Sequence, residues 1–315
     1  MGVKAVNFAA HDTIESLLGD WVIHLKAEGA AERTPTTYVY AVEQFTRWLT
    51  AHGLTHEVGA LRRDDIDAWT SDTLKHLKPA TVSLRWRALH VFFKWLESEE
   101  LVTVSPMSQL RPPKVPVKVV PLLPPDAAKK LLKTCLGKDF RSRRDMALLA
   151  LLMDTGARLA EVTNLRYTPN DPDTNDVHLD AGYLRVMGKG QVERTIPLGR
   201  LVARAISTYL LSRRQHPAAR LPWLWLSGSR HARLTDSGIR QMVEDRATEA
   251  GLGHLHPHMF RHNFAHSMKL TGMRDEEIMA IAGWKAHSML TRYGGSAAEV
   301  RAKAAHAKHS LMDNL

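Results

Sequence analysis

The sequence has little cysteine and no long apolar segment. Of its 315 residues one is a cysteine, Cys135, which excludes an intrachain disulfide and any cysteine-rich zinc site. A single thiol fits a reducing compartment. The longest apolar run, 146–153, is far too short to cross a bilayer, and residues 1–21 carry early acidic side chains and lack the apolar core of a signal peptide. We therefore predict a cytoplasmic protein that does not span a membrane.

Acidic side chains are outnumbered by basic ones, and the net charge at pH 7 is +10. The excess is uneven, since residues 1–105 hold 11 Lys and Arg against 14 Asp and Glu. A surplus of this size favours a polyanionic partner such as nucleic acid. Many basic proteins bind none, so charge alone leaves the partner open.

Apolar periodicity predicts a first part built of helices. The helices are expected to begin at Thr13, near Thr34, at 63 and near Pro79. A proline-rich basic segment follows, where proline disfavours helix and an extended strap is expected. The predicted divisions are an N-terminal tail over 1–10, a helical DNA-binding domain over 11–104, a linker over 105–122 and a catalytic domain with a C-terminal helical tail over 123–315.

The second part is predicted to be mixed. Between 167 and 198, short β-prone runs are broken by Gly and Asp, which indicates a small antiparallel sheet with a turn at 188–190. Helical patterns stand on both sides of it, and the alanine-rich end of the chain, 297–315, is also helical in propensity. The predicted fold is mainly α with one small antiparallel β-sheet.

Two groups of basic residues are candidate contacts for a phosphate backbone. One falls at i, i+3 and i+7 of the fourth helix, where a solvated face is the commoner explanation, and the other lies in the linker. The candidates are Arg87, His90, Lys94, Arg111, Lys114 and Lys118.

Two further cations stand in unusual contexts. Arg158 follows the end of a buried helix, where a guanidinium needs an anion or a partner, and Glu161 three residues later is an equally good local partner. Lys189 lies between two glycines at the expected turn. The surrounding glycines do not have P-loop spacing and no hydroxyl follows the lysine, which argues against ATP binding and leaves a plain hairpin tip as the alternative.

A histidine-rich stretch over 256–268 is open to three explanations: a metal site, a nucleic-acid contact or an acid–base centre. His258 and His262 share a helical face, but no cysteine or carboxylate completes a zinc set, and Arg261 lies between them. We predict no metal. Tyr293, followed by two glycines, is a last candidate, for which a surface tyrosine near a helix end is the alternative.

The order of these motifs resembles the tyrosine recombinase (phage integrase) family. The stretches "TGARLAEVTNLR", "GKGQVERTIPL", "HPHMFRHNFAH" and "AGWKAHSMLTRYG" follow the family order of Arg, Lys, His-x-x-Arg, His or Trp, and Tyr. Residues 79–107 also resemble the family's helical core-binding domain running into its linker. Two positions depart from the commonest pattern: Phe260 replaces a leucine, and Trp284 replaces a histidine and cannot transfer protons. The matched positions are Arg158, Lys189, His258, Arg261, Trp284 and Tyr293.

The resemblance implies a DNA strand-transfer enzyme without metal or other cofactor. Arg158 and Arg261 would clamp a phosphate with help from Trp284, and Tyr293 would form a 3′-phosphotyrosyl link. His258 would accept the phenol proton and Lys189 would protonate the leaving oxygen. Glu161 and His262 are expected to support this site.

The resemblance further implies double-stranded DNA core sites, a homotetramer on DNA that passes through a Holliday junction, and room for a directionality factor. About ten residues precede the first helix, so we expect the two-domain type without an arm-binding domain. The alternatives are a type IB topoisomerase-like enzyme that relaxes supercoils and a DNA-binding protein without catalysis.

Overall fold

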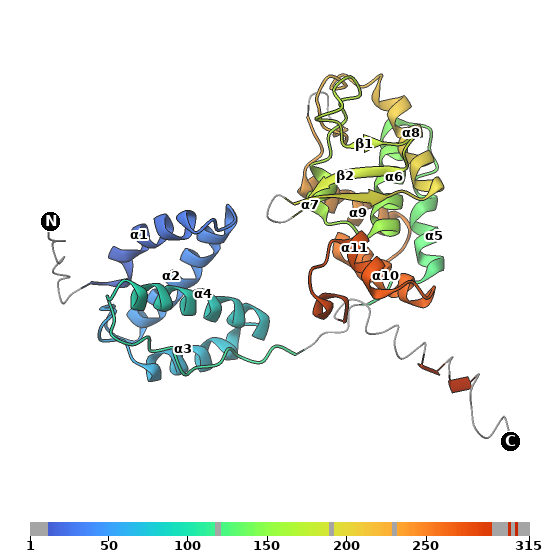
Figure 1. Cartoon of the computed structure of the whole chain (residues 1–315). Coiled ribbons are helices and arrows are strands. Elements are labelled where there is room, and N and C mark those ends of the chain that lie inside the picture. Colours follow the sequence, from blue (N-terminus) through green and yellow to red (C-terminus); the bar gives the residue numbers. More distant parts are fainter. Residues whose placement is uncertain are drawn as a thin grey trace. The chain divides into compact units, whose positions relative to one another are not determined.

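The computed structural model describes residues 12–116, 121–188, 192–228, 232–291, 302–303 and 306–307. The chain divides into two compact units, Met1–Lys118 and Val119–Leu315. Figure 1 shows a first unit made of helices and a second unit with a small sheet and helices around it. The division falls within the proline-rich segment.

The first unit contains the four helices expected from the sequence: α1 (Ile14–Ala27), α2 (Arg33–Ala51), α3 (Arg63–His76) and α4 (Pro79–Ser98). Thr13 caps α1 by accepting from the Ser16 N–H, while the Ser16 hydroxyl accepts from the Thr13 N–H. Pro79 takes the first position of α4, where its missing N–H costs nothing. Their apolar faces meet in an aromatic core that includes Trp21, Phe45, Trp69 and Phe92.

The second unit has a three-stranded antiparallel sheet in the order β1-β2-β3, so the predicted fold class is confirmed. Sequence patterning gave no helix at α11, which the structure adds. The elements are α5 (Pro125–Lys133), α6 (Phe140–Thr155), α7 (Leu159–Thr163), β1 (Val177–His178), β2 (Tyr183–Met187), β3 (Glu193–Pro197), α8 (Arg200–Arg213), α9 (Asp236–Glu249), α10 (Pro257–Leu270) and α11 (Asp275–Ala282).

Helix α6 is the centre of the second unit and contacts α8 and α10. It ends at Gly156, whose φ of +56° is left-handed and therefore suits glycine. A Cβ at this position would lie 2.7 Å from the ring of Phe264 on α10. The end of α6 is thus pressed against α10, and this brings the next residues of the chain toward the histidine-rich helix.

Within the described ranges no helix is both long and apolar enough to cross a lipid bilayer. The alanine-rich tail predicted over 297–315 lies outside the described residues, apart from the helical pairs 302–303 and 306–307.

Candidate active site

Arg158 stands where α6 gives way to α7. Glu161, one turn into α7, accepts from the Arg158 backbone N–H and from its Nη1, both at 2.8 Å. The local ion pair considered from the sequence is therefore present. The Glu161 carboxylate is buried, whereas the Arg158 side chain keeps 35% of its surface exposed. A guanidinium anchored on one side and open on the other can still receive an anion.

Arg261 lies on α10 and is only 3% exposed. Its Nη1 donates to the Gly156 carbonyl at 2.6 Å and its Nη2 to the Ala282 carbonyl at 2.7 Å. The guanidinium carbon also lies 4.6 Å from the centre of the Trp284 ring, a cation–π contact. Arg261 therefore ties the ends of α6 and α11 together and places Trp284 beside itself.

The two arginines converge although 103 positions separate them in the chain. Arg158 donates from Nη2 to the Gly283 carbonyl at 2.8 Å, and Arg261 donates to the Ala282 carbonyl that directly precedes it. Gly283 ends α11 with a φ of +66°, and α11 leads into Trp284. Three of the predicted site residues thus meet at one helix end.

His258 lies one turn before Arg261 on α10 and is exposed to solvent. Its pKa is lowered from the usual 6.5, first by partial removal of water and then by the positive charges of His256, Arg240 and Arg261. The lowered pKa keeps the ring neutral at physiological pH, the form that can accept a proton. His262 is buried on the same helix.

Arg194 on β3 joins the site and was not singled out in the sequence. Its Nη2 donates to Glu161 Oε2 at 2.9 Å, and its Nη1 donates to the Ile281 carbonyl. The "VERT" stretch gave one available signal, a cation two positions before the buried Ile196 and therefore on the same face of the strand. That signal locates an arginine on a face without naming its partner.

Lys189 and Tyr293 lie outside the described residues, as does Lys118. The described strands β2 and β3 flank the first of these positions, and residue 291 is the last described one before the second. Their predicted roles stay predictions.

The remaining candidate DNA contacts lie in the first unit. Arg87, Lys94, Arg111 and Lys114 are exposed. His90 is partly buried and stacks on Trp86, with ring centres 5.2 Å apart. A basic stripe on α4 is therefore present, and DNA contact through it stays a prediction.

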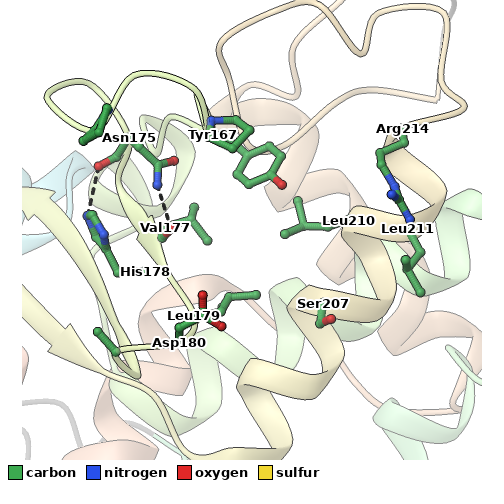
Figure 2. A pocket seen from close by; sticks show the side chains of 13 residues that line it. Tyr167, Asn175, Val177, His178, Leu179, Asp180, Ser207, Leu210, Leu211 and Arg214 are labelled. Atoms are coloured by element: carbon green, nitrogen blue, oxygen red, sulfur yellow. Dashed lines mark hydrogen bonds between the residues drawn. The ribbon is translucent and has the colours of Figure 1, made fainter.

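The arginine site is separate from the cavity of about 600 Å³ in Figure 2. That cavity lies between α8 and the chain around β1, and its walls include Tyr167, Val177, Leu210 and Arg214. Across the described parts of the chain, no group of three or more His, Cys, Asp or Glu side chains is arranged to hold a metal ion.

A helical unit followed by a mixed unit in which two arginines and a tryptophan meet, with a histidine one turn before one of the arginines, defines a protein of the integrase class. The phage integrase family matches residues 121–299, and the phage integrase N-terminal SAM-like domain matches residues 17–103. The chain belongs to the phage integrase family.

Its relatives are named as recombinases. The tyrosine recombinase XerC of Oceanobacillus iheyensis is 29% identical over 286 residues, which cover 89% of this chain and 91% of that protein. Among solved structures, the XerH site-specific recombinase in a post-cleavage complex with palindromic difH substrate has a TM-score of 0.72 at 18% identity, covering 92% of this chain and 84% of that one. A lambda integrase tetramer bound to a Holliday junction has a TM-score of 0.66 at 18% identity, covering 89% and 80%. At these identities the structures show a shared fold.

Proposed function

We propose that this chain is a site-specific DNA recombinase that cleaves and rejoins strands through a 3′-phosphotyrosyl intermediate. The observation that carries the proposal is the meeting of Arg158 and Arg261 on the neighbouring carbonyls of Gly283 and Ala282, next to Trp284. Guanidinium groups offer paired N–H donors that match phosphate oxygens. Membership in the phage integrase family and the names of the relatives support the same activity.

In the proposed reaction the hydroxyl of Tyr293 attacks the scissile phosphorus. The bond from phosphorus to the 5′ oxygen breaks as the bond to the tyrosine oxygen forms. The phosphate therefore remains a diester, joined to the 3′ oxygen of the DNA and to the tyrosine. Charge that develops on the two non-bridging oxygens is stabilised by Arg158 and Arg261, for which a few kcal/mol per donor is the usual order. The phosphotyrosyl bond conserves the energy of the broken one, so neither ATP nor a metal is needed.

Two protons move in this scheme. The phenol has an ordinary pKa of about 10 and needs a base, and His258, whose pKa is lowered, is the candidate. Lys189 protonates the departing 5′ oxygen. A 5′-hydroxyl of the partner duplex then reverses both steps and joins new ends.

The proposal includes double-stranded core sites, a homotetramer and a Holliday junction. The lambda integrase tetramer on a Holliday junction supports this assembly through its shared fold. We also propose that a directionality factor acts as an accessory partner. The proposed compartment is the cytoplasm, where the DNA core sites would lie.

The test is covalent capture on a suicide substrate nicked next to a candidate core site. The wild-type chain should form a protein–DNA adduct on a denaturing gel, and Tyr293→Phe should form none while its band-shift affinity for the same DNA stays within about twofold, because only one hydroxyl is removed. Supercoil relaxation without site preference would identify a topoisomerase instead. Binding without any wild-type adduct would identify a DNA-binding protein.

A further inference from the structure

Arg194 links three elements of the second unit. It lies on β3, it bonds the buried Glu161 on α7, and it bonds the Ile281 carbonyl in the last turn of α11. Its side chain is only 15% exposed. It is therefore placed behind Arg158, which shares the same carboxylate and is more than twice as exposed.

The last turn of α11 receives three arginines on three successive carbonyls. Arg194 donates to Ile281, Arg261 to Ala282 and Arg158 to Gly283. The last carbonyls of a helix have no partner within it, and the helix dipole makes this end negative. These carbonyls therefore offset part of the repulsion among three guanidiniums that would otherwise push one another apart.

The three arginines differ in their contacts and in their exposure to solvent. Arg158 combines the carboxylate with open surface, and Arg261 holds Trp284. Arg194 has both terminal nitrogens bonded to protein and little exposed surface, so it does not reach a DNA phosphate. Any effect of Arg194 on the reaction must pass through Glu161 and the end of α11.

We propose that Arg194 is a positioning residue of the phosphate site, acting through Glu161 on Arg158 and through the Ile281 carbonyl on the helix end that holds Arg158 and Arg261. The proposal rests on the proposed function. It predicts that the site is assembled before DNA arrives, because its cations are already held by a carboxylate and a helix terminus. Loss of Arg194 leaves Arg158 present and misplaced, and misplacement by about 1 Å can cost about 100-fold in rate.

The test compares two suicide substrates that differ only at the scissile position. One carries the ordinary anionic phosphate and the other an uncharged methylphosphonate, which needs far less charge stabilisation. Arg194→Gln should slow cleavage of the phosphate substrate by about 10- to 100-fold and that of the methylphosphonate substrate by less than about 3-fold. Arg194→Lys should lie between, since lysine keeps the charge and loses the planar fork that spans two acceptors.

Arg185→Gln is the matched control. Arg185 lies on the neighbouring strand β2 and pairs with Asp176 at 3.2 Å. The substitution therefore removes an arginine of the same sheet whose partner is not Glu161. It should change cleavage of both substrates by less than about 2-fold. Thermal unfolding and band-shift affinity of all variants report the fold and DNA binding separately.

Three outcomes overturn the proposal. Arg194→Gln cleaves at the wild-type rate, or it loses the same factor on both substrates, which indicates a purely structural role. The third is an Arg194→Lys variant that folds as wild type and whose loss of rate on the phosphate substrate, relative to the methylphosphonate substrate, is no greater than that of Arg185→Gln. If the wild-type chain cleaves neither substrate, the proposed function has failed, and the positioning role fails with it.

Discussion

Two arginine sites in the second unit both donate hydrogen bonds to backbone carbonyls, but they differ in what these bonds achieve. Arg213 on α8 donates to the carbonyls of Ala219, Leu221, Trp223 and Leu224, and burial lowers its pKa. It fastens the loop after α8 to the helix. The cluster of Arg158, Arg194 and Arg261 also donates to carbonyls, but three cations share one helix end.

The difference lies in what remains after the internal bonds are made. Arg213 uses four of its five N–H groups on backbone carbonyls, and because the residue is only 3% exposed the fifth is not accessible to a ligand. Arg158 engages Nη1 and Nη2 once each on side-chain and backbone acceptors in the described bonds and stays open to solvent. Carbonyl contacts alone therefore do not distinguish the two sites, whereas the concentration of charge and the residual exposure of Arg158 do.

The largest expected effect comes from substituting one arginine in each of the two sites and comparing cleavage rate with stability. Arg158→Gln should lower the rate of adduct formation by about 100- to 1000-fold, because an oriented donor to the phosphate is lost. Arg213→Gln should lower the free energy of unfolding by about 2–4 kcal/mol, because several buried carbonyls lose their donor. Single-turnover cleavage and urea unfolding measure the two quantities on the same samples.

The comparison requires opposite patterns in the two variants. Arg158→Gln should keep most of its stability, and folded Arg213→Gln should cleave at a rate close to wild type. Two variants that lose stability and rate in parallel would show that the arginine cluster is a second fastening of the fold.

The sequence predicts the parts of this site that depend on short spacing. Arg158 and Glu161 are three positions apart, so their pair follows from helix geometry. The contacts of Arg158 with Gly283 and of Arg194 with Ile281 span 125 and 87 positions. No local pattern encodes them, because they depend on how α6, β3, α10 and α11 pack.

The same reasoning explains why α11 was missed while α1 to α4 were found. The four N-terminal helices have 14 to 20 residues and apolar positions at helical intervals. Helix α11 has eight residues and an unbroken apolar run from Ile278 to Ala282 that gives no helical period. A helix this short owes its stability to tertiary contacts, here in part to the arginines at its end.

A second, smaller effect tests whether the helix end positions the cluster. A Cβ on Gly283 would lie 2.5 Å from Nε of Arg194, and φ there is +66°. Gly283→Ala should therefore combine backbone strain of about 1–2 kcal/mol with displacement of Arg194, and slow cleavage by about 10-fold.

Gly251→Ala supplies the control for strain alone. Gly251 has nearly the same φ, +65°, and a Cβ there would meet nothing within 4 Å. It should lose similar stability and keep the wild-type cleavage rate. Equal rates for the two alanine variants would mean that the end of α11 does not govern the arginines.

The smallest effect concerns the charges around His258. Its pKa is lowered from 6.5 by desolvation, and then by His256, Arg240 and Arg261, so the neutral ring is already the main form at pH 6.5. If His258 is the base, the rate of adduct formation rises with pH through this lowered pKa and levels off above it. Arg240 is exposed and can be removed without touching the arginine cluster.

Arg240→Gln removes a positive charge that disfavours the protonated ring, so the pKa of His258 should rise and the midpoint of the rate profile should move to higher pH with it. The rate near the midpoint falls by less than about twofold, and the plateau at pH 8 is unchanged, because there the ring is neutral in both proteins. Arg204→Gln, an exposed arginine on α8 that does not act on His258, should leave the midpoint in place. A midpoint that moves equally in both variants would report net charge and its effect on DNA binding. His258 would then not be the base, and the arginine cluster would lack the neighbouring proton acceptor proposed for it.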